Sequence, residues 1–435
     1  MPPAEADIIE IPPIGPVRGT VRVPGSKSHT NRSLVIAALS DGGSRLDGAL
    51  LAADTISMIE GLRSLGFRVE PDETAGAIVV EGRGGVIPAR GASIDARDAG
   101  TVMRFLPAVV ALGEGKFTID GSARMRERPV GDLVEGLRSL GVDAVASGPG
   151  GCPPVVVRAS GLAGGTARVS AATSSQFASA LLLAAPCAKS PVTIELEGEV
   201  VSRPFIELTL DLMRNFGAEV ESESPNVFRV AAPRPYRAGA HRIEGDATAA
   251  SYFWAAAAVT GGRVEVANVG TRSHQGDARF VDVLEKMGCR VERSEEAITA
   301  SGPEVLRGGE FDLNKMPDVA QTLAVAALFA DSPVTITNIA NLRVKECDRL
   351  SALAAELPKL GGRVEERPDG ITVTPPEGGR SGLHGGRIVT YNDHRMAMSF
   401  AVAGLAIPGV VIENPGCVSK TYPRFFDDFA RLAGG

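Results

Sequence analysis

The sequence has few aromatic residues, few cysteines and no long hydrophobic runs. Aromatic residues make up 5% of its 435 positions, whereas 51 glycines and 29 prolines indicate many short elements joined by tight turns. The five cysteines are far apart and form no C-x-x-C pair, which argues against both a disulfide framework and a zinc site. The longest apolar stretches, such as 253–259 and 323–330, are too short to span a membrane.

An excess of positive charge is also lacking, since the formal net charge is -7. This charge provides no global basic field for nucleic acid or an anionic membrane. The N-terminus is acidic and interrupted by prolines, unlike a signal or transit peptide, and we expect a cytoplasmic protein. Hydrophobic residues at 44% indicate a packed globular protein, and the length predicts two domains.

A repeat of about 73 residues runs through the chain. Its first marker is a helix-like segment that ends in glycine and is followed by a strand-like segment, as in GLRSLGFRVE at 61–70 and GLRSLGVDAV at 136–145. Glycine is the natural residue just past a helix end, because it adopts the left-handed conformation without a Cβ clash. The marker recurs at Gly66, Gly141, Gly217, Gly288, Gly361 and Gly434, at intervals of 71 to 76 residues.

A second marker keeps the same phase, as an Ala/Leu-rich helix begins once in each repeat. The predicted starts are Ser28, Thr101, Ser174, Ala247, Asp318 and Asp393. Their nearly continuous apolar content predicts helices that are buried on most sides. We therefore predict an α/β fold of six repeats divided into two lobes of three. Polar residues at helix starts are ordinary caps and need no functional explanation by themselves.

Positive charge is concentrated at the starts of these helices and of the helices that follow them. Cations are unfavourable at the positive end of a helix dipole unless an anion lies between them. Lys and Arg side chains usually lie on the solvated surface. These ones recur at the same position of most repeats, which favours a cleft that holds two polyanionic ligands. No Walker motif supports nucleotide binding. The cations are Lys27, Arg32, Arg104, Arg124, Arg126, Arg128, Arg203, Lys345, Arg349, Arg395 and Lys420.

Nine segments, in order, resemble the 5-enolpyruvylshikimate-3-phosphate synthase family from end to end. They are PGSKSHTNR (24–32), AGTVMR (99–104), RMRERPVGDL (124–133), SSQFASALL (174–182), GDATAASYF (245–253), MPDVAQTLA (316–324), NLRVKECDRL (341–350), YNDHRMAM (391–398) and KTYP (420–423). The resemblance implies a two-lobed inside-out α/β barrel of six βαβαββ repeats, three per lobe. One lobe would comprise 1–25 plus 245–435 and the other 26–244, with the active site in the cleft between them.

The resemblance also implies an activity. It is transfer of the enolpyruvyl group of phosphoenolpyruvate to the 5-hydroxyl of shikimate 3-phosphate, with release of phosphate, on the shikimate pathway to chorismate and the aromatic amino acids. No metal or redox cofactor is required, and a monomer is expected. The family is also the target of glyphosate, which competes with phosphoenolpyruvate.

Roles follow from the matched positions. The residues implied for shikimate 3-phosphate are Lys27, Ser28, Arg32, Ser174, Ser175, Gln176, Ser202, Asp318, Asn341 and Lys345. Those implied for phosphoenolpyruvate are Lys27, Gly100, Arg124, Gln176, Arg349, His394, Arg395 and Lys420. Asp318, Glu346 and Lys27 would transfer protons, because C3 of phosphoenolpyruvate must gain a proton and the attacking hydroxyl must lose one.

Three positions depart from the family pattern, namely Asp98, Phe105 and Phe205. Phe205 stands where a tyrosine is usual, which predicts weaker binding of shikimate 3-phosphate. Three other readings remain. The related transferase that acts on UDP-N-acetylglucosamine usually has a cysteine in the loop at 120–129, where none occurs here. RNA terminal phosphate cyclase would need nucleotide-binding features that are not found. A non-catalytic homologue would be expected to have lost some of the acid/base groups, yet all are present.

Overall fold

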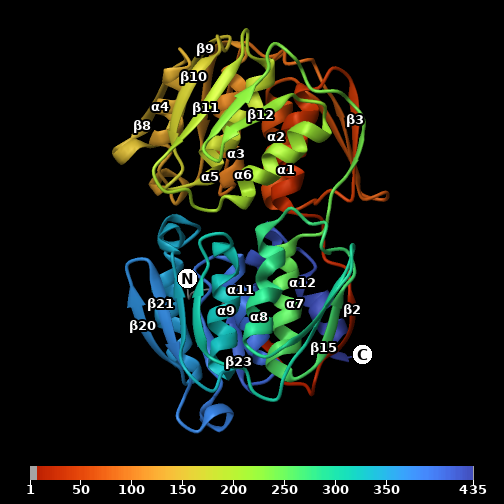
Figure 1. Ribbon diagram of the computed structural model, residues 1–435, viewed down its shortest axis with the longest axis vertical. Helices are drawn as coiled ribbons and strands as arrows, with labels where there is room; N and C mark the ends of the chain where they lie inside the picture. The colour runs from red at the N-terminus through yellow and green to blue at the C-terminus, as the bar shows by residue number, and fades with distance from the viewer. Residues whose placement is uncertain (1–6, 435) are drawn as a thin grey trace, which may run out of the picture. The chain divides into compact units, whose positions relative to one another are not determined.

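The computed structural model describes residues 7–434, which form two compact units that are each described by themselves. Unit 1 comprises the chain up to Pro24 and the chain from Gly245 onward, and unit 2 is Gly25–Glu244. The labelled strands of each unit flank its helices on both sides (Figure 1). The acidic start of the chain, residues 1–6, and Gly435 of the last repeat lie outside the described residues.

Unit 2 contains three four-stranded sheets of one topology. In strand order they are β14-β3-β5-β4, β6-β7-β9-β8 and β10-β11-β13-β12. In each sheet the first pair of strands is parallel and the next two pairs are antiparallel. The strands are β3 (Gly43–Asp47), β4 (Arg68–Asp72), β5 (Ala77–Glu81), β6 (Gly91–Asp95), β7 (Glu114–Asp120), β8 (Asp143–Gly148), β9 (Cys152–Ser160), β10 (Gly165–Ser170), β11 (Val192–Glu197), β12 (Val220–Ser224), β13 (Val227–Val230) and β14 (Ala240–Arg242).

Unit 1 repeats this topology, with sheets β2-β15-β17-β16 and β18-β19-β21-β20 and a three-stranded sheet β22-β23-β1. Each again begins with a parallel pair followed by antiparallel pairing. The strands are β1 (Ile8–Ile11), β2 (Arg18–Val21), β15 (Arg263–Val266), β16 (Arg290–Arg293), β17 (Ile298–Ser301), β18 (Gly309–Asp312), β19 (Val334–Thr337), β20 (Arg363–Arg367), β21 (Gly370–Thr374), β22 (Arg387–Ile388) and β23 (Val410–Glu413). These six small sheets confirm the predicted α/β class.

Six buried helices, three in each unit, follow the second marker. Ala247 begins a helix, Ser174 and Asp393 are N-caps, and Asp318 lies in the 3-10 turn η5 (Pro317–Val319) that leads into a helix. The starts predicted at Ser28 and Thr101 are each one residue late. The helices are α1 (Lys27–Leu39), α3 (Gly100–Val110), α5 (Ser175–Ala184), α7 (Ala247–Thr260), α9 (Ala320–Ala326) and α11 (His394–Gly404).

A second helix in each repeat ends close to a marker glycine. These helices are α2 (Ala53–Ser64), α4 (Gly131–Ser139), α6 (Pro204–Asn215), α8 (Phe280–Lys286), α10 (Arg349–Glu356) and α12 (Phe425–Gly434). Helices α2, α4, α6 and α8 end two residues before the glycine, the 3-10 helix η8 (Leu357–Leu360) lies between α10 and Gly361, and α12 ends at Gly434. The first five markers, Gly66 through Gly361, have φ between 81° and 103°, the left-handed region in which a Cβ would be strained. The predicted switch from helix to strand is therefore confirmed at these five positions.

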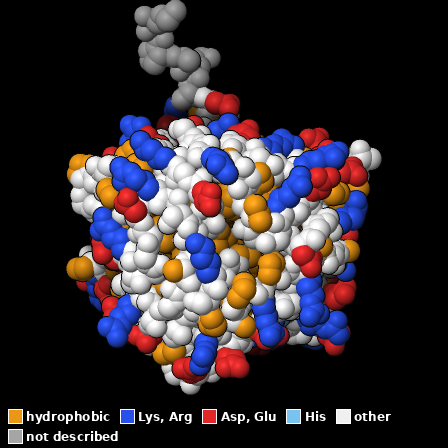
Figure 2. All heavy atoms as spheres, turned by 90° about the horizontal axis from the view of Figure 1, so that it is seen from above, with side chains coloured by type: hydrophobic (Ala, Val, Ile, Leu, Met, Phe, Trp, Pro, Cys, Tyr) orange, Lys and Arg blue, Asp and Glu red, His pale blue; other side chains and the backbone are white. Residues whose placement is uncertain are grey.

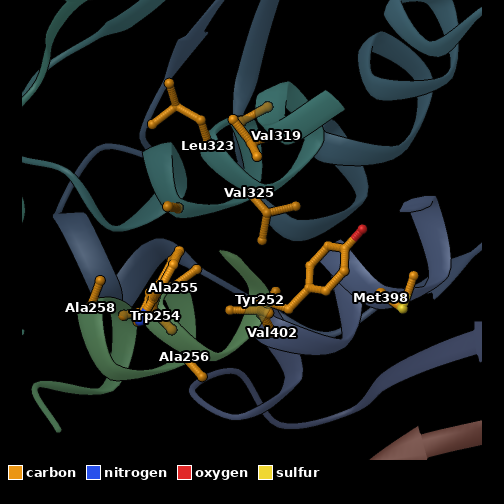
Figure 3. Packing of buried hydrophobic residues seen from close by; sticks show 14 of the residues in the cluster. Tyr252, Trp254, Ala255, Ala256, Ala258, Val319, Leu323, Val325, Met398 and Val402 are labelled. Atoms are coloured by element: carbon orange, nitrogen blue, oxygen red, sulfur yellow. The ribbon is translucent and has the colours of Figure 1, made fainter. Parts of the chain in front are cut away.

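The core of unit 1 lies among α7, α9 and α11. Trp254 is completely buried, as predicted, and its indole Nε1 donates to the carbonyl of Ile298 at 3.1 Å. Figure 3 shows Tyr252 of α7 beside Val325 of α9 and Val402 of α11, with its hydroxyl pointing away from α7. This packing fixes the N-terminal ends of the helices, where the predicted site residues lie.

Charged side chains of both signs are interspersed on the face shown in Figure 2. Exposed charged side chains of the described residues also form ion pairs; Arg68, for example, reaches Glu70 at 2.8 Å and Glu81 at 3.1 Å. Exposed pairs of this kind contribute only about 0–1 kcal/mol each. The buried charges described next are of a different kind.

Candidate active site

Lys27 is the first residue of α1, and its ammonium lies against a carboxylate that the sequence analysis missed. Its Nζ is 3.3 Å from Oδ2 of Asp54, in the first turn of α2, and the two side chains are only 15% and 5% exposed. Aspartate is common in first turns, so the sequence alone gave Asp54 no distinction. The pair holds a cation at the N-terminal end of α1, as predicted for Lys27.

Arg32, one turn further along α1, is 1% exposed and is held by neutral groups. Its Nε donates to the Thr209 hydroxyl at 2.7 Å, and its terminal nitrogens donate to the Ser28 carbonyl at 3.0 Å and the Phe205 carbonyl at 3.2 Å. Its guanidinium carbon lies 5.3 Å and 5.7 Å from the ring centroids of Phe105 and Phe205. Burial lowers the pKa of Arg32 to about 9, because no carboxylate is among these contacts to offset desolvation.

The predicted phosphate-binding serines lie at two other helix starts of unit 2. Ser174 caps α5, where its hydroxyl accepts from the backbone N–H of Gln176 at 3.2 Å, and Ser175 is buried in the first turn. Ser202 is buried just before α6 and has φ of +55°. Left-handed conformations of non-glycine residues cluster at functional sites.

Gly100 begins α3 and lies against two guanidinium groups. A Cβ at this position would lie 3.1 Å from a terminal nitrogen of Arg104 and 3.2 Å from one of Arg128, so a larger residue would require these guanidinium groups to shift by a few tenths of an ångström. Arg104 is 4% and Arg128 6% exposed. Gly100 therefore marks a buried, positively charged corner of unit 2.

Arg124 is a predicted phosphoenolpyruvate contact in the segment RMRER. It precedes the 3-10 turn η1 (Met125–Glu127), and its guanidinium donates to Glu127 at 2.7 Å with 35% of the side chain exposed. The guanidinium groups nearest Gly100 belong to Arg104 and Arg128. The contact of Arg124 with phosphoenolpyruvate stays a prediction, and Arg128 is a buried cation that the predicted site did not include.

Two cations of the predicted charge pattern belong to the solvated surface. Arg126 forms a two-pronged contact with Asp120 at 2.6 Å and 2.9 Å, and Arg203 donates to the carbonyl of Pro225 at 2.6 Å. Asp98, which departs from the family pattern, accepts a short hydrogen bond from the Ser122 hydroxyl. Asp98 therefore ties the loop before α3 to the segment that leads into η1.

In unit 1 the predicted residues form one cluster around Asp318. The carboxylate of Asp318 accepts from Arg349 at 3.0 Å and from Arg395 at 3.0 Å, and Nζ of Lys345 lies 3.6 Å away. Side-chain exposure is 13% for Asp318 and 8% for Arg395. Burial is the largest single effect and lowers the pKa of Arg395, but the charges of Asp318, Tyr252 and Asp277 together outweigh it and raise the pKa above its ordinary value.

Arg349 organises the cluster from the start of α10. Its side chain is 1% exposed, and its Nε donates to Asp393 at 2.7 Å while a terminal nitrogen donates to Glu346 at 2.9 Å. With Asp318, three carboxylates share this guanidinium. We call the whole group the Asp318 cluster; it comprises Asp318, Lys345, Glu346, Arg349, Asp393 and Arg395.

Three further predicted residues lie deeper in unit 1. Asn341, in the 3-10 helix η7 (Ala340–Val344), is 7% exposed, and Lys420, which ends η10 (Pro415–Lys420), is 8% exposed. His394 is completely buried, with Nδ1 3.5 Å from the Asp393 carboxylate. The ring therefore lies beside the residue that caps α11, and the contact of His394 with phosphoenolpyruvate stays a prediction.

Asp277 is an acid that the sequence analysis did not identify. It lies in the 3-10 turn η4 (Gly276–Arg279), is 2% exposed and accepts a short hydrogen bond from the Thr248 hydroxyl of α7. Burial and the negative charge of Asp318 raise its pKa to about 7, against the opposing effect of Arg395. A single aspartate in the segment QGDARF gave no signal for such a place.

Within residues 7–434, no group of three or more His, Cys, Asp or Glu side chains is arranged to hold a metal ion. None of the helices in this part of the chain is long and apolar enough to cross a membrane.

Comparison with known proteins gives one consistent family. The family model described as EPSP synthase (3-phosphoshikimate 1-carboxyvinyltransferase) matches residues 11–429. A 3-phosphoshikimate 1-carboxyvinyltransferase of Trichormus variabilis is 44% identical and covers 98% of this chain and 100% of its own length. The chloroplastic enzyme of Arabidopsis thaliana is 45% identical, with 98% of this chain and 85% of that protein covered. A solved structure of EPSP synthase from Acinetobacter baumannii superimposes with a TM-score of 0.81 at 26% identity over 98% of both chains. The chain belongs to the EPSP synthase (3-phosphoshikimate 1-carboxyvinyltransferase) family.

Proposed function

We propose that this protein transfers the enolpyruvyl group of phosphoenolpyruvate to the 5-hydroxyl of shikimate 3-phosphate and releases inorganic phosphate. The Asp318 cluster carries this proposal, because it gathers acids and fixed cations of the kind that the reaction requires. Family membership over nearly the whole chain supports the choice of substrates.

The reaction adds the 5-hydroxyl across the double bond of phosphoenolpyruvate. C3 gains a proton, the hydroxyl oxygen bonds to C2 and loses its proton, and the tetrahedral adduct then loses a methyl proton and phosphate. A C–O bond forms at C2, the C–O bond to phosphate breaks and protons are transferred, with no oxidation or reduction overall, so the protein's task is acid–base catalysis and charge stabilisation. Glu346 and Lys27 are proposed to transfer the protons at C3, and Asp318 is proposed to accept the proton of the 5-hydroxyl.

Shikimate 3-phosphate is proposed to bind the unit 2 residues, together with Asp318, Asn341 and Lys345. Arg32 supports this role, because a buried guanidinium held by neutral acceptors would gain most from an anion nearby. The starts of α5 and α6 add oriented backbone N–H groups, which favour phosphate. The unit 2 residues are Lys27, Ser28, Arg32, Ser174, Ser175, Gln176 and Ser202.

The contacts proposed for phosphoenolpyruvate are those that the resemblance implies, with one addition. Arg124, His394, Arg395 and Lys420 keep these roles, and Arg128 is added because it is buried beside Gly100. All three nitrogens of Arg349 already donate to carboxylates, so a ligand would bind it by exchange for one of these. Lys27 and Gln176 remain proposed contacts to this substrate.

The test measures phosphate release from phosphoenolpyruvate, with shikimate 3-phosphate or UDP-N-acetylglucosamine as acceptor in parallel. Release only with shikimate 3-phosphate is expected. Asp318→Asn should reduce it by about 10²-fold or more, since one positioned acid or base contributes about 10²–10⁴-fold. Arg126→Gln is the matched control, because Arg126 pairs with Asp120 on the surface. Release only with the nucleotide sugar, or none from the folded protein, would overturn the proposal.

We also infer from the resemblance that the protein acts as a monomer in the cytoplasm. Light scattering coupled to size exclusion should give the mass of one chain at micromolar concentration. A mass of two chains that persists on dilution would contradict this.

A further inference from the structure

The backbone just before α11 is strained at two consecutive positions. Tyr391 and Asn392 have φ of 54° and 55°, in the left-handed region that non-glycine residues rarely occupy. The next residue is Asp393, which caps α11 and binds Arg349, and Arg395 follows within the first turn. Strained backbone persists only where the surroundings hold it, so the turn must be fixed by other contacts.

A single buried carboxylate supplies those contacts. Glu356 is 1% exposed, and its Oε1 accepts from the Tyr391 hydroxyl at 2.9 Å. Its Oε2 accepts from the backbone N–H of Val389 at 2.9 Å and from Nζ of Lys359 at 2.7 Å. Glu356 therefore holds the chain at two points of the segment that leads into the strained turn.

The helix that carries Glu356 also carries Arg349. Arg349 is the first residue of α10 and Glu356 is the last, so this one rigid helix contacts the segment before α11 at both ends. At one end Arg349 binds Asp393 at 2.7 Å, and at the other end Glu356 binds Tyr391. The spacing between Arg349 and Arg395 is thereby set by α10 and the turn together.

We propose that Glu356 is a positioning residue for the reaction, which fixes the Tyr391–Asn392 turn and through it the alignment of Arg395 with Arg349. This inference rests on the proposed function. A carboxylate is suited to the task because its two oxygens accept three hydrogen bonds, from a phenol, a backbone N–H and an ammonium. A misplacement of about 1 Å at a catalytic group can cost 10²-fold in rate.

The ordinary alternative is that Glu356 only pairs with Lys359 and stabilises the fold. The two roles differ in what they affect. Positioning predicts a change in the affinity for phosphoenolpyruvate, the ligand proposed for Arg349 and Arg395. A purely structural role predicts a lower Tm with an unchanged KM.

The experiment compares Glu356→Gln, Tyr391→Phe and Lys359→Met with the wild type in the phosphate-release assay. Glu356→Gln should raise KM for phosphoenolpyruvate by about tenfold or more, because a misplaced group can cost up to about 10²-fold. KM for shikimate 3-phosphate should change by less than about twofold, a small effect on the scale of such misplacements. Tyr391→Phe removes one hydroxyl bond and should shift the same KM in the same direction by less. Lys359→Met should lower Tm and leave both KM values unchanged.

A double variant gives a readout that a structural role would not change. Glycine adopts positive φ without strain, so adding Asn392→Gly to Glu356→Gln should recover part of the lost affinity. Unchanged KM for phosphoenolpyruvate in both Glu356→Gln and Tyr391→Phe would overturn the inference, as would an equal rise in both KM values. If Glu356→Gln does not fold, Tyr391→Phe alone decides between these outcomes.

Direct binding separates this inference from the proposed function. Calorimetric titration of phosphoenolpyruvate into wild type and Glu356→Gln requires no turnover. Weaker binding by the variant, in a protein that releases no phosphate with shikimate 3-phosphate, would retain the positioning role and reject the proposed reaction. Equal binding of phosphoenolpyruvate by the two proteins, in an enzyme that releases phosphate with shikimate 3-phosphate, would retain the proposed reaction and reject the positioning role.

Discussion

Arg128 and Arg126 provide a matched pair of substitutions for the proposed phosphoenolpyruvate site. They are two residues apart in one basic segment, yet Arg128 is 6% exposed beside Gly100, whereas Arg126 pairs with Asp120 at 56% side-chain exposure. Glutamine at either position removes the charge and keeps a polar side chain. The two variants therefore separate a buried charge near a helix start from a solvated one.

The expected magnitudes differ widely. Truncating one partner of a buried, hydrogen-bonded charge pair costs about 2–5 kcal/mol, which corresponds to roughly 30-fold to several thousand-fold in kcat/KM for phosphoenolpyruvate. An exposed ion pair is worth about 0–1 kcal/mol, so Arg126→Gln should cost at most about fivefold. The position of Gly100 also predicts the larger loss for Arg128→Gln, because the absence of a Cβ at Gly100 leaves space for the Arg128 guanidinium.

The assay is steady-state phosphate release with phosphoenolpyruvate varied at saturating shikimate 3-phosphate, and then the reverse. Arg128→Gln should affect mainly the phosphoenolpyruvate parameters, and the Tm of both variants shows whether they are folded. The reasoning would be refuted if a folded Arg128→Gln lost less than about fivefold in kcat/KM, the limit expected for a surface pair, or if Arg126→Gln lost more than Arg128→Gln.

Three further predictions follow from buried groups. Folding raises the pKa of Asp277 from 3.8 to about 7. Ionisation of Asp277 therefore has no effect on stability below about pH 4, lowers stability increasingly as the pH rises from about 4 to about 7, and has its full effect above about pH 7. Asp277→Asn should therefore raise Tm relative to wild type more at pH 8 than at pH 5, and an equal shift at both pH values would contradict this. Phe205→Tyr should lower KM for shikimate 3-phosphate, because its ring lies 5.7 Å from the guanidinium of Arg32; an unchanged KM would reject the hypothesis. Trp254→Ala should lower the free energy of unfolding by about 3–5 kcal/mol in urea titrations, because it empties a completely buried site, and a loss below about 1 kcal/mol would show that the core refills the space.

Periodicity made much of the fold predictable. A helix that is buried on all sides needs an uninterrupted apolar segment, and a helix that ends at a strand needs a residue with positive φ. Both constraints act locally, so the starts of α7 and α11 and the turns at Gly66 and Gly288 could be read from single segments. The parallel pairing of β14 with β3 could not be read in this way, because the two strands lie near opposite ends of the sequence of unit 2.

The positions of candidate site residues were predictable where one residue type at one helix start sufficed, as for Lys27 and Ser174. It was not predictable where the choice depended on three-dimensional placement. RMRER offers three arginines in one segment, and the 3-10 turn at Met125–Glu127 decides which of them reaches Gly100. Asp277 and Glu356 gave no signal either, because their importance comes from burial beside residues that are distant in sequence.

The charge pattern of the sequence predicted a positive cleft that attracts anions, but the cations of unit 1 are not bare. In the Asp318 cluster the cations are already met by carboxylates of the protein, and Arg349 alone contacts three. A phosphate or carboxylate ligand that binds there must therefore exchange with these acids rather than fill a bare positive pocket. Exchange leaves a displaced carboxylate in a place of low dielectric, where the neutral form is favoured. An acid that is released from its cation as the substrate arrives can then accept or deliver a proton at that moment, which links binding of phosphoenolpyruvate to the proton transfers proposed for Glu346 and Asp318.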